Sequence, residues 1–150
     1  MREILFKAKG TTTGKWYEGF LVALNEDCCH IKDDKGAVYY CDINTICQYT
    51  GLTDKNGNKI WENDIIRTQK FTDKPHSRNF KEKDFVGVVT YKIYSTNNFN
   101  NPSIPNHNYE AKWEVKLTEN VGKFSYCSKS KFYDCEVIGN RFDNTELLEV

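Results

Sequence analysis

One run of the sequence, residues 109–117, alternates apolar and charged side chains without a break. Tyr, Ala, Trp, Val and Leu occupy the odd positions, and Glu or Lys occupies each even one. Because neighbouring side chains of a strand point to opposite faces of a sheet, this pattern predicts a strand with one buried face. We therefore expect a chain built mainly on antiparallel sheets.

Four other segments are rich in β-branched and aromatic residues and predict further strands, at 16–24, 28–31, 37–41 and 85–94. The turn-forming residues 32–36 separate two of these strands, so residues 1–47 are predicted to form an N-terminal β meander. Gly87 marks a bulge or a close backbone approach inside its strand. Helical spacing is absent except near the end, where Asn144 could cap a short turn through residues 145–148.

Two long polar connections are predicted between the strands, at residues 70–84 and 95–108. Connections of this length in a compact domain are usually functional or mobile, so both are places to look for a partner. The second connection is rich in asparagine and contains Pro102 and Pro105, a composition that disfavours regular structure.

Composition narrows the class of protein. The 150 residues suit one domain, and their 21 basic and 21 acidic residues give a net charge of zero, so no whole-chain charge favours nucleic acid or a membrane surface.

No apolar run is long enough to cross a bilayer and the start lacks a signal-peptide pattern, so we expect a cytoplasmic protein with no membrane partner. The six cysteines are then expected to be free structural thiols, because no closely spaced ligand pair predicts a metal site.

The predicted core consists of apolar residues of the expected strands: Trp16, Phe20, Val22, Tyr49, Leu52, Ile60, Ile65, Val89, Tyr91, Trp113, Val115, Val137 and Ile138.

Residues 48–66 read Gln-Tyr-Thr-Gly-Leu-Thr-Asp-Lys-Asn-Gly-Asn-Lys-Ile-Trp-Glu-Asn-Asp-Ile-Ile. Within them, residues 54–57 form a tight-turn sequence, with Gly57 where a positive φ is needed, and residues 62–64 form a second polar bend. Asp54, Asn56 and Asn58 have the alternate spacing of calcium ligands, but the glycine and the acidic residue of such a loop are missing, so a plain turn is predicted. The motif positions that we single out, as structural, are Gln48, Tyr49, Gly51, Asp54, Asn56, Gly57, Ile60, Trp61, Glu62 and Asp64.

This segment resembles the signature of the YopX-like family of phage and prophage proteins, QYTGLxDxNGxxI[YFW]EGDI[IV]. Residues 87–91 resemble a further strand of that family, and residues 136–140 with 146–148 resemble its C-terminal EVIGN and NPELL segment. Two departures are Asn63 for the usual glycine and Thr145 for the usual proline. Asparagine tolerates a left-handed backbone, so the first change is compatible with the same turn.

The resemblance implies a small SH3-like β-barrel over residues 48–150, in a protein of bacterial viruses or prophages. It does not imply a particular reaction. From the resemblance, residues 1–150 are expected to form one YopX-like protein. No cofactor and no small-molecule substrate is inferred, and no catalytic or metal-binding residue is assigned.

Three functions are compared. The first is a non-catalytic protein-interaction or assembly module, because an acidic end (Asp134, Glu136, Asp143, Glu146 and Glu149 against Arg141) could associate with a basic loop of another copy to give a homo-oligomer. The alternative is nucleic-acid binding by that basic loop, residues 67–83, in which aromatic residues lie among basic ones: Arg67, Lys70, Phe71, Lys74, Arg78, Phe80, Lys81 and Lys83. A metal-dependent phosphodiesterase built on Asp54, Glu62 and Asp64 is the weakest. We expect a non-enzymatic protein with a protein partner.

Overall fold

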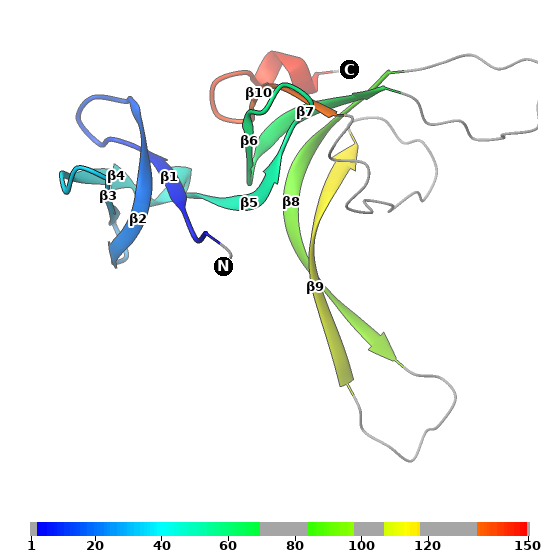
Figure 1. Cartoon of the computed structure of the whole chain (residues 1–150), viewed down its shortest axis with the longest axis horizontal. Helices are drawn as coiled ribbons and strands as arrows, with labels where there is room; N and C mark the ends of the chain where they lie inside the picture. The colour runs from blue at the N-terminus through cyan, green and yellow to red at the C-terminus, as the bar shows by residue number, and fades with distance from the viewer. Residues whose placement is uncertain (1–2, 70–83, 98–106, 118–134, 150) are drawn as a thin grey trace, which may run out of the picture.

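The structure is a computed structural model that describes residues 3–69, 84–97, 107–117 and 135–149 (Figure 1). The described elements are strands and two short 3-10 helices, so the chain is mainly β, as predicted. In chain order they are β1 (Phe6–Lys9), β2 (Trp16–Leu24), β3 (Cys28–Lys32), β4 (Val38–Asp42), η1 (Ile43–Thr45), β5 (Cys47–Thr53), β6 (Lys59–Trp61), β7 (Asp64–Gln69), β8 (Asp84–Asn97), β9 (His107–Leu117), β10 (Cys135–Asn140) and η2 (Thr145–Leu148). Neither of these helices is long and apolar enough to cross a membrane.

The strands form two antiparallel sheets. One has six strands in the order β4-β3-β2-β1-β5-β6, and the other has four in the order β10-β7-β8-β9. The N-terminal meander is confirmed, because β1 pairs with β2, β2 with β3 and β3 with β4. The first sheet continues past the boundary predicted after residue 47, since Phe6 of β1 pairs with Gln48 of β5.

The SH3-like barrel is not confirmed. A single bridge between Gly10 and Cys41 brings β4 back beside the end of β1, which curls the first sheet. In the part of the chain that the structure describes, neither sheet closes into a barrel by continuous strand pairing.

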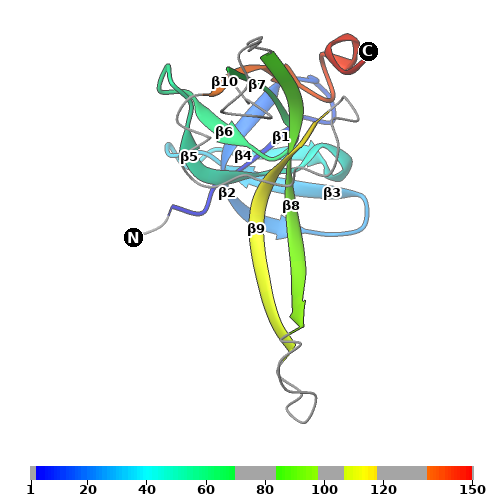
Figure 2. The same ribbon diagram turned by 90° about the vertical axis from the view of Figure 1, so that its right-hand side faces the viewer.

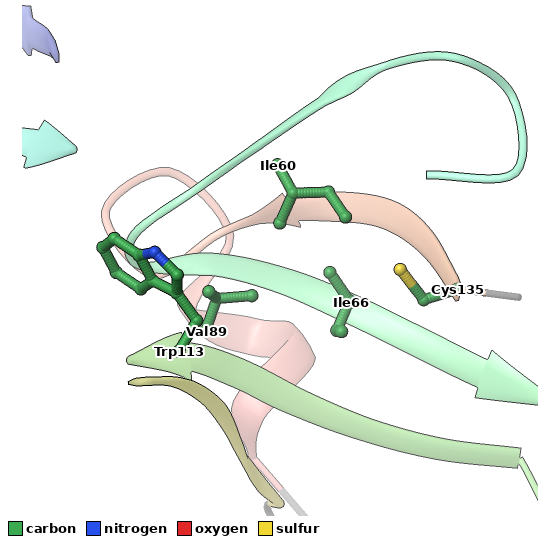
Figure 3. Close-up of a cluster of buried hydrophobic side chains, with 5 residues drawn as sticks. All are labelled: Ile60, Ile66, Val89, Trp113 and Cys135. Carbon is green, nitrogen blue, oxygen red and sulfur yellow. The ribbon is translucent and has the colours of Figure 1, made fainter. Parts of the chain in front are cut away.

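Three groups of buried side chains hold the strands together. The first lies between the β5–β6 hairpin and the second sheet and contains Ile60, Ile66, Val89, Trp113 and Cys135 (Figure 3). The second, Leu5, Cys47, Tyr49 and Trp61, lies where the two sheets meet. The third, Ala8, Cys29, Ile31 and Cys41, fills the inner face of the N-terminal strands. Ile60 and Trp61, adjacent in β6, therefore belong to different groups.

The core prediction is confirmed for Tyr49, Ile60, Ile65, Val89 and Trp113, which are all buried. It is wrong for Phe20, Val22 and Tyr91, which are exposed. Both faces of β2 carry apolar side chains, and the inner face of the sheet takes Leu21 rather than Phe20. Sequence alternation shows which residues share a face, but it does not show which face is covered.

The connection predicted at 95–108 is shorter than expected, because β8 and β9 extend into it. Its polar side chains do not prevent this, since strands pair through their main chains. The register of β8 and β9 continues from Gly87 opposite Leu117 to Asn97 opposite His107. The resulting hairpin projects well beyond the rest of the molecule (Figure 2). Of the other predicted connection, residues 70–83 lie outside the described residues and Asp84 already belongs to β8.

The short helical turn predicted at the end is confirmed as η2, but the predicted cap is wrong. The side chain of Asn144 makes no capping hydrogen bond to η2. Its Oδ1 instead accepts a hydrogen bond from the backbone N–H of Asn140, which closes the bend that follows β10. A second helical turn, η1, was not predicted and is capped by Asp42, whose side chain accepts from Asn44 N–H.

Gly87 is a close backbone approach, as predicted. A Cβ atom at this position would lie 2.5 Å from Cγ1 of Val115 and 2.8 Å from the carbonyl oxygen of Lys116. We expect Gly87→Ala to lower the free energy of unfolding by roughly 1–3 kcal/mol through overpacking, measured by urea denaturation. Lys116→Ala, an exposed change on the facing strand, is the control and should stay within about 0.5 kcal/mol of the wild type. Equal stabilities of Gly87→Ala and the control would contradict this packing.

Candidate functional site

Asp54, in the 48–66 segment, has a buried carboxylate that accepts hydrogen bonds through both oxygens. Oδ1 accepts from the backbone N–H groups of Asn56 and Asn58, both at 2.9 Å, which closes the predicted turn between β5 and β6. Oδ2 accepts from the side-chain amide of Asn58 at 3.2 Å and from the backbone N–H of Val137 at 3.0 Å. One side chain thus shapes the turn and fixes β10 against it.

The hydrogen bonds that Asp54 accepts change its pKa more than its burial does. Burial alone would raise the pKa of this carboxyl, but the donors from Val137, Asn58 and Asn56 favour the charged form and lower the pKa below its usual value. A main-chain hydrogen bond, from Lys55 N–H to the carbonyl of Cys135 at 3.0 Å, strengthens the same contact between the turn and β10. Asp54 is therefore an ionised structural acceptor whose oxygens are already occupied.

Asp64 has a similar structural role at the other end of the segment. Its Oδ2 accepts from the backbone N–H of Trp61 at 2.8 Å, and its Oδ1 lies 2.8 Å from Nζ of Lys7 on β1. The Lys7 ammonium also lies 5.1 Å from the ring centroid of Trp16 and 5.3 Å from that of Trp61, within cation-π range. Burial raises the pKa of Asp64, and the neighbouring Lys7 charge opposes that rise. The pair holds the first sheet against the start of the second.

The remaining motif positions shape the backbone. Asn63 has a φ of 65°, so the left-handed turn predicted for this departure from the family pattern is confirmed. Its carbonyl accepts from Arg141 N–H, which ties the C-terminal segment to the bend. Gly51, with a φ of 80°, lies where the pairing of β5 and β6 shifts register. Glu62 and Gln48 bond through their main chains at 2.9 Å.

The carboxylates proposed for metal chemistry do not converge. Asp54 faces the turn and β10, Asp64 faces Lys7, and Oε2 of Glu62 lies 3.4 Å from the backbone nitrogen of Gln48. The described residues contain no cluster of three or more His, Cys, Asp or Glu side chains that could hold a metal ion.

Five of the cysteines lie in the described residues and are free thiols. Four of these are buried, and burial raises the pKa of Cys29 and that of Cys47 to about 11. Thiols with such pKa values stay protonated and unreactive near neutral pH. Cys28 is half-buried, with its sulfur 3.6 Å from Nε2 of His30.

The basic loop predicted to bind a partner falls almost entirely outside the described residues. Only Arg67 is described, exposed on β7 and opposite Glu136 of β10. Lys70, Phe71, Lys74, Arg78, Phe80, Lys81 and Lys83 lie in the part that is not described. Of the acidic end, Glu136 lies 3.3 Å from Nζ of Lys55, and Asp143 is bonded to Lys9 and to the indole N–H of Trp16.

Large apolar side chains are exposed on the solvent-facing side of β2, β3 and β4, which we call the outer face. Phe20, Lys32 and Val38 form one row across these strands, and His30 and Tyr40 form the next. Phe20 is 52% exposed, Val38 47% and Tyr40 64%. The ring of Tyr40 also contacts that of His30, edge to face, at 4.3 Å. This surface is rich in aromatic side chains, and the described residues leave it uncovered.

A second exposed apolar surface follows the projecting hairpin. Val89, Tyr91 and Ile93 lie on one face of β8, and Trp113 lies directly opposite Tyr91. Val89 and Trp113 are buried at the base, whereas Tyr91 is 47% exposed and Ile93 63%. The stripe thus leaves the core and continues into solvent along the hairpin, whose backbone projects from the rest of the molecule in Figure 2. We call the hairpin outward from Tyr91 and Trp113 the arm.

Trp113 also has an unusual polar atom at the base of the arm. Its Nε1 is buried, and the described residues offer it no hydrogen-bond acceptor. The ring packs against Tyr91 with centroids 4.8 Å apart.

The sequence did not predict either of the two exposed apolar surfaces. Apolar residues on both faces of β2 and β4 were visible, however, and are a signal for a sheet that is covered on two sides.

The hydrogen bonds that the Asp54 carboxylate accepts give a direct prediction. Asp54→Asn replaces an acceptor oxygen by a donor beside N–H groups, so we expect it to lower the free energy of unfolding by about 2–3 kcal/mol, measured by urea denaturation. Asn56→Ala is the matched control, because Asn56 contributes its backbone N–H and its side chain is exposed, and the loss should stay below about 1 kcal/mol. Similar losses in the two variants would show that the turn, and not the carboxylate, matters.

The bonds of Asp143 predict a pH dependence. Hydrogen bonds from Lys9, Trp16 and Asn140 lower the pKa of this carboxyl from 3.8 to about 2. Its contribution to stability is therefore complete above about pH 4 and is lost as the pH falls through about 2. The stability difference between wild type and Asp143→Asn should shrink over that interval, as followed by thermal melts at stepped pH. A difference that stays constant from pH 5 to pH 2 would contradict this.

Comparison with known proteins gives the family of the chain. Among solved structures, the chain is similar to one titled "Crystal structure of protein EF1440 from Enterococcus faecalis", with 20% sequence identity and a TM-score of 0.46 over 99% of this chain and 100% of that one. A comparison with curated proteins gives no match. A family model described as YopX protein matches residues 6–149, which is nearly the whole sequence, and the chain therefore belongs to the YopX family.

Proposed function

We propose that this YopX family member is a non-catalytic protein-interaction module that a phage or prophage supplies to the cytoplasm of its bacterial host. The observation that supports this most is the exposure of large apolar side chains in two separate places, the outer face and the arm. Single exposed apolar residues are common on protein surfaces, but grouped ones mark sites where another molecule binds.

The chemistry of the rest of the described chain is consistent with a binding role. The motif carboxylates accept hydrogen bonds that hold strands together, and four of the thiols are buried. Aromatic residues such as Phe20, Tyr40 and Tyr91 supply contact area with few rotatable bonds, which is why tyrosine is frequent among the residues that dominate binding energy. We therefore assign binding to the two apolar surfaces, and structure to the motif.

Site-specific crosslinking in cells tests this function. A photoreactive phenylalanine analogue is placed at Phe20, Tyr40 or Tyr91 of the full chain, one position at a time, and at Ile4, an exposed apolar position outside both surfaces, as the control. After irradiation of bacteria that express the chain, we expect protein adducts at the three surface positions and few at position 4, as seen by denaturing gel electrophoresis and mass spectrometry.

The outcome also separates a protein partner from nucleic acid. Adducts that nuclease treatment returns to the mass of the free chain would replace a protein partner by nucleic acid. An equal yield of adducts at all four positions, or none at any, would refute the assignment of binding to these surfaces.

A further inference from the structure

The outer strand of the arm, β9, lies at one edge of the second sheet, and the described residues place no strand beyond it. β9 has 11 residues, whereas β6, at an edge of the first sheet, has three. The other two edges are engaged within the chain: Thr11 N–H donates to the Tyr40 carbonyl of β4, and Val137 N–H of β10 donates to Asp54. An edge strand presents N–H and C=O groups that can pair with a strand of another chain.

Alternate residues of β9 direct their main-chain groups to this edge. The carbonyl of Val89 on β8 accepts from Asn63 N–H, on the side of β8 that faces β7. In an antiparallel ladder, residues that bond to the neighbouring strand alternate with residues that point away from it. The residue opposite Val89 and every second residue outward along β9, including Trp113, Ala111 and Tyr109, therefore direct their N–H and C=O groups away from β8.

The charges on one face of β9 alternate in sign. Residues 110, 112, 114 and 116 are Glu, Lys, Glu and Lys, and residues two apart in a strand share a face. Suppose that two copies of β9 pair antiparallel about a two-fold axis. An axis through an odd-numbered residue places glutamates opposite lysines, whereas an axis through an even-numbered residue places like charges opposite each other, which is destabilising. An axis between two residues places apolar side chains opposite charged ones.

We infer that two copies of the chain pair through the β9 edges of their arms, antiparallel and centred on Ala111. Ala111 is exposed and lies in the arm, which projects from the rest of the molecule (Figure 2). Glu110 of each copy then lies opposite Lys112 of the other. These two pairs are of the type without main-chain bonds, in which side chains come closest. The contact goes beyond the proposed function, because it uses a main-chain edge and neither of the apolar surfaces.

The neighbours of Lys112 in its own arm favour this pairing. Lys112 is directly opposite Lys92, a like charge, so a glutamate on its other side adds a favourable neighbour. This gain does not depend on the contacts that Lys112 makes in its own copy, because a residue of an inner strand borders strands on both sides. The other strand of the arm offers no such match, since Lys92 is the single charged residue of 89–97.

A contact of this kind is symmetric, because the same edge of both copies takes part. It uses each β9 edge once and therefore closes at two copies.

The test uses two substitutions in the full chain, Glu110→Lys and Lys112→Glu, each of which makes positions 110 and 112 alike in charge. Lys116→Glu is the matched control, because it makes the same change at an exposed position of β9 outside the paired stretch. Each protein is treated with nuclease and checked by circular dichroism for the wild-type β spectrum. Its mass is then measured by light scattering coupled to size exclusion over a range of concentrations at low salt.

The wild type and the control should approach twice the monomer mass of 17.5 kDa as the concentration rises, and should not exceed it. Each single variant should dissociate at least tenfold more readily, because both of its charge pairs become repulsive. An equal mixture of the two variants should dimerise like the wild type, since lysines of one copy then meet glutamates of the other. The double variant, with both residues exchanged, should also dimerise, and high salt should reduce these differences.

Four results would overturn the inference: a wild type that stays a monomer throughout, single variants that dimerise like the wild type, a mixture that stays monomeric while the wild type dimerises, or assemblies that grow beyond two copies. Dissociation of the Lys116→Glu control would overturn the centring on Ala111.

The crosslinking experiment keeps this inference separate from the proposed function. Adducts at Phe20, Tyr40 or Tyr91, together with a monomeric wild type, would refute the pairing of arms and leave the binding function supported. A wild-type dimer with the expected charge dependence, but without adducts at those positions, would do the reverse.

Discussion

The hydrogen bonds accepted by the Asp54 carboxylate determine how the two sheets are joined. The turn between β5 and β6 and the backbone of β10 are 83 residues apart in the sequence at the Val137 contact, and one buried side chain bonds to both. The β5–β6 hairpin belongs to the first sheet by its main chain and to the core of the second sheet by Ile60. Fixing β10 against this hairpin therefore positions β7 and β8, which pair beside it, and with them the base of the arm.

The family motif of this chain and the surfaces that we propose to bind a partner are made of different residues. Residues 48–66 give the most specific signature in the sequence, and the described contacts of Asp54, Asn63 and Asp64 are structural. The surfaces that we assign to binding come from residues with no motif, such as Phe20, Tyr40 and Ile93.

Sequence reasoning predicted the local structure well and the distant contacts poorly. Alternation located β9, and turn chemistry located the bend at Asp54 and the left-handed Asn63, because these depend on neighbouring residues. It did not predict that Lys7 pairs with Asp64, or that Asp54 binds Val137, because such contacts depend on how sheets come together. Phe20 and Tyr91 were placed in the core for the same reason. An apolar residue on a strand indicates that its face of the sheet is covered, but the sequence does not show what covers it. Residues of both exposed surfaces were therefore predicted to be core.

The position of β6 has a consequence for how the protein unfolds. Its adjacent residues Ile60 and Trp61 point into different cores, so a three-residue strand is shared by both halves of the molecule. Opening either core exposes one of these two side chains and loosens the strand that carries the other. The two sheets are for this reason coupled into one cooperative unit, whereas the arm beyond Trp113 contributes little to either core. Loss of strand pairing in the arm would then leave the thermodynamic unit beneath it intact.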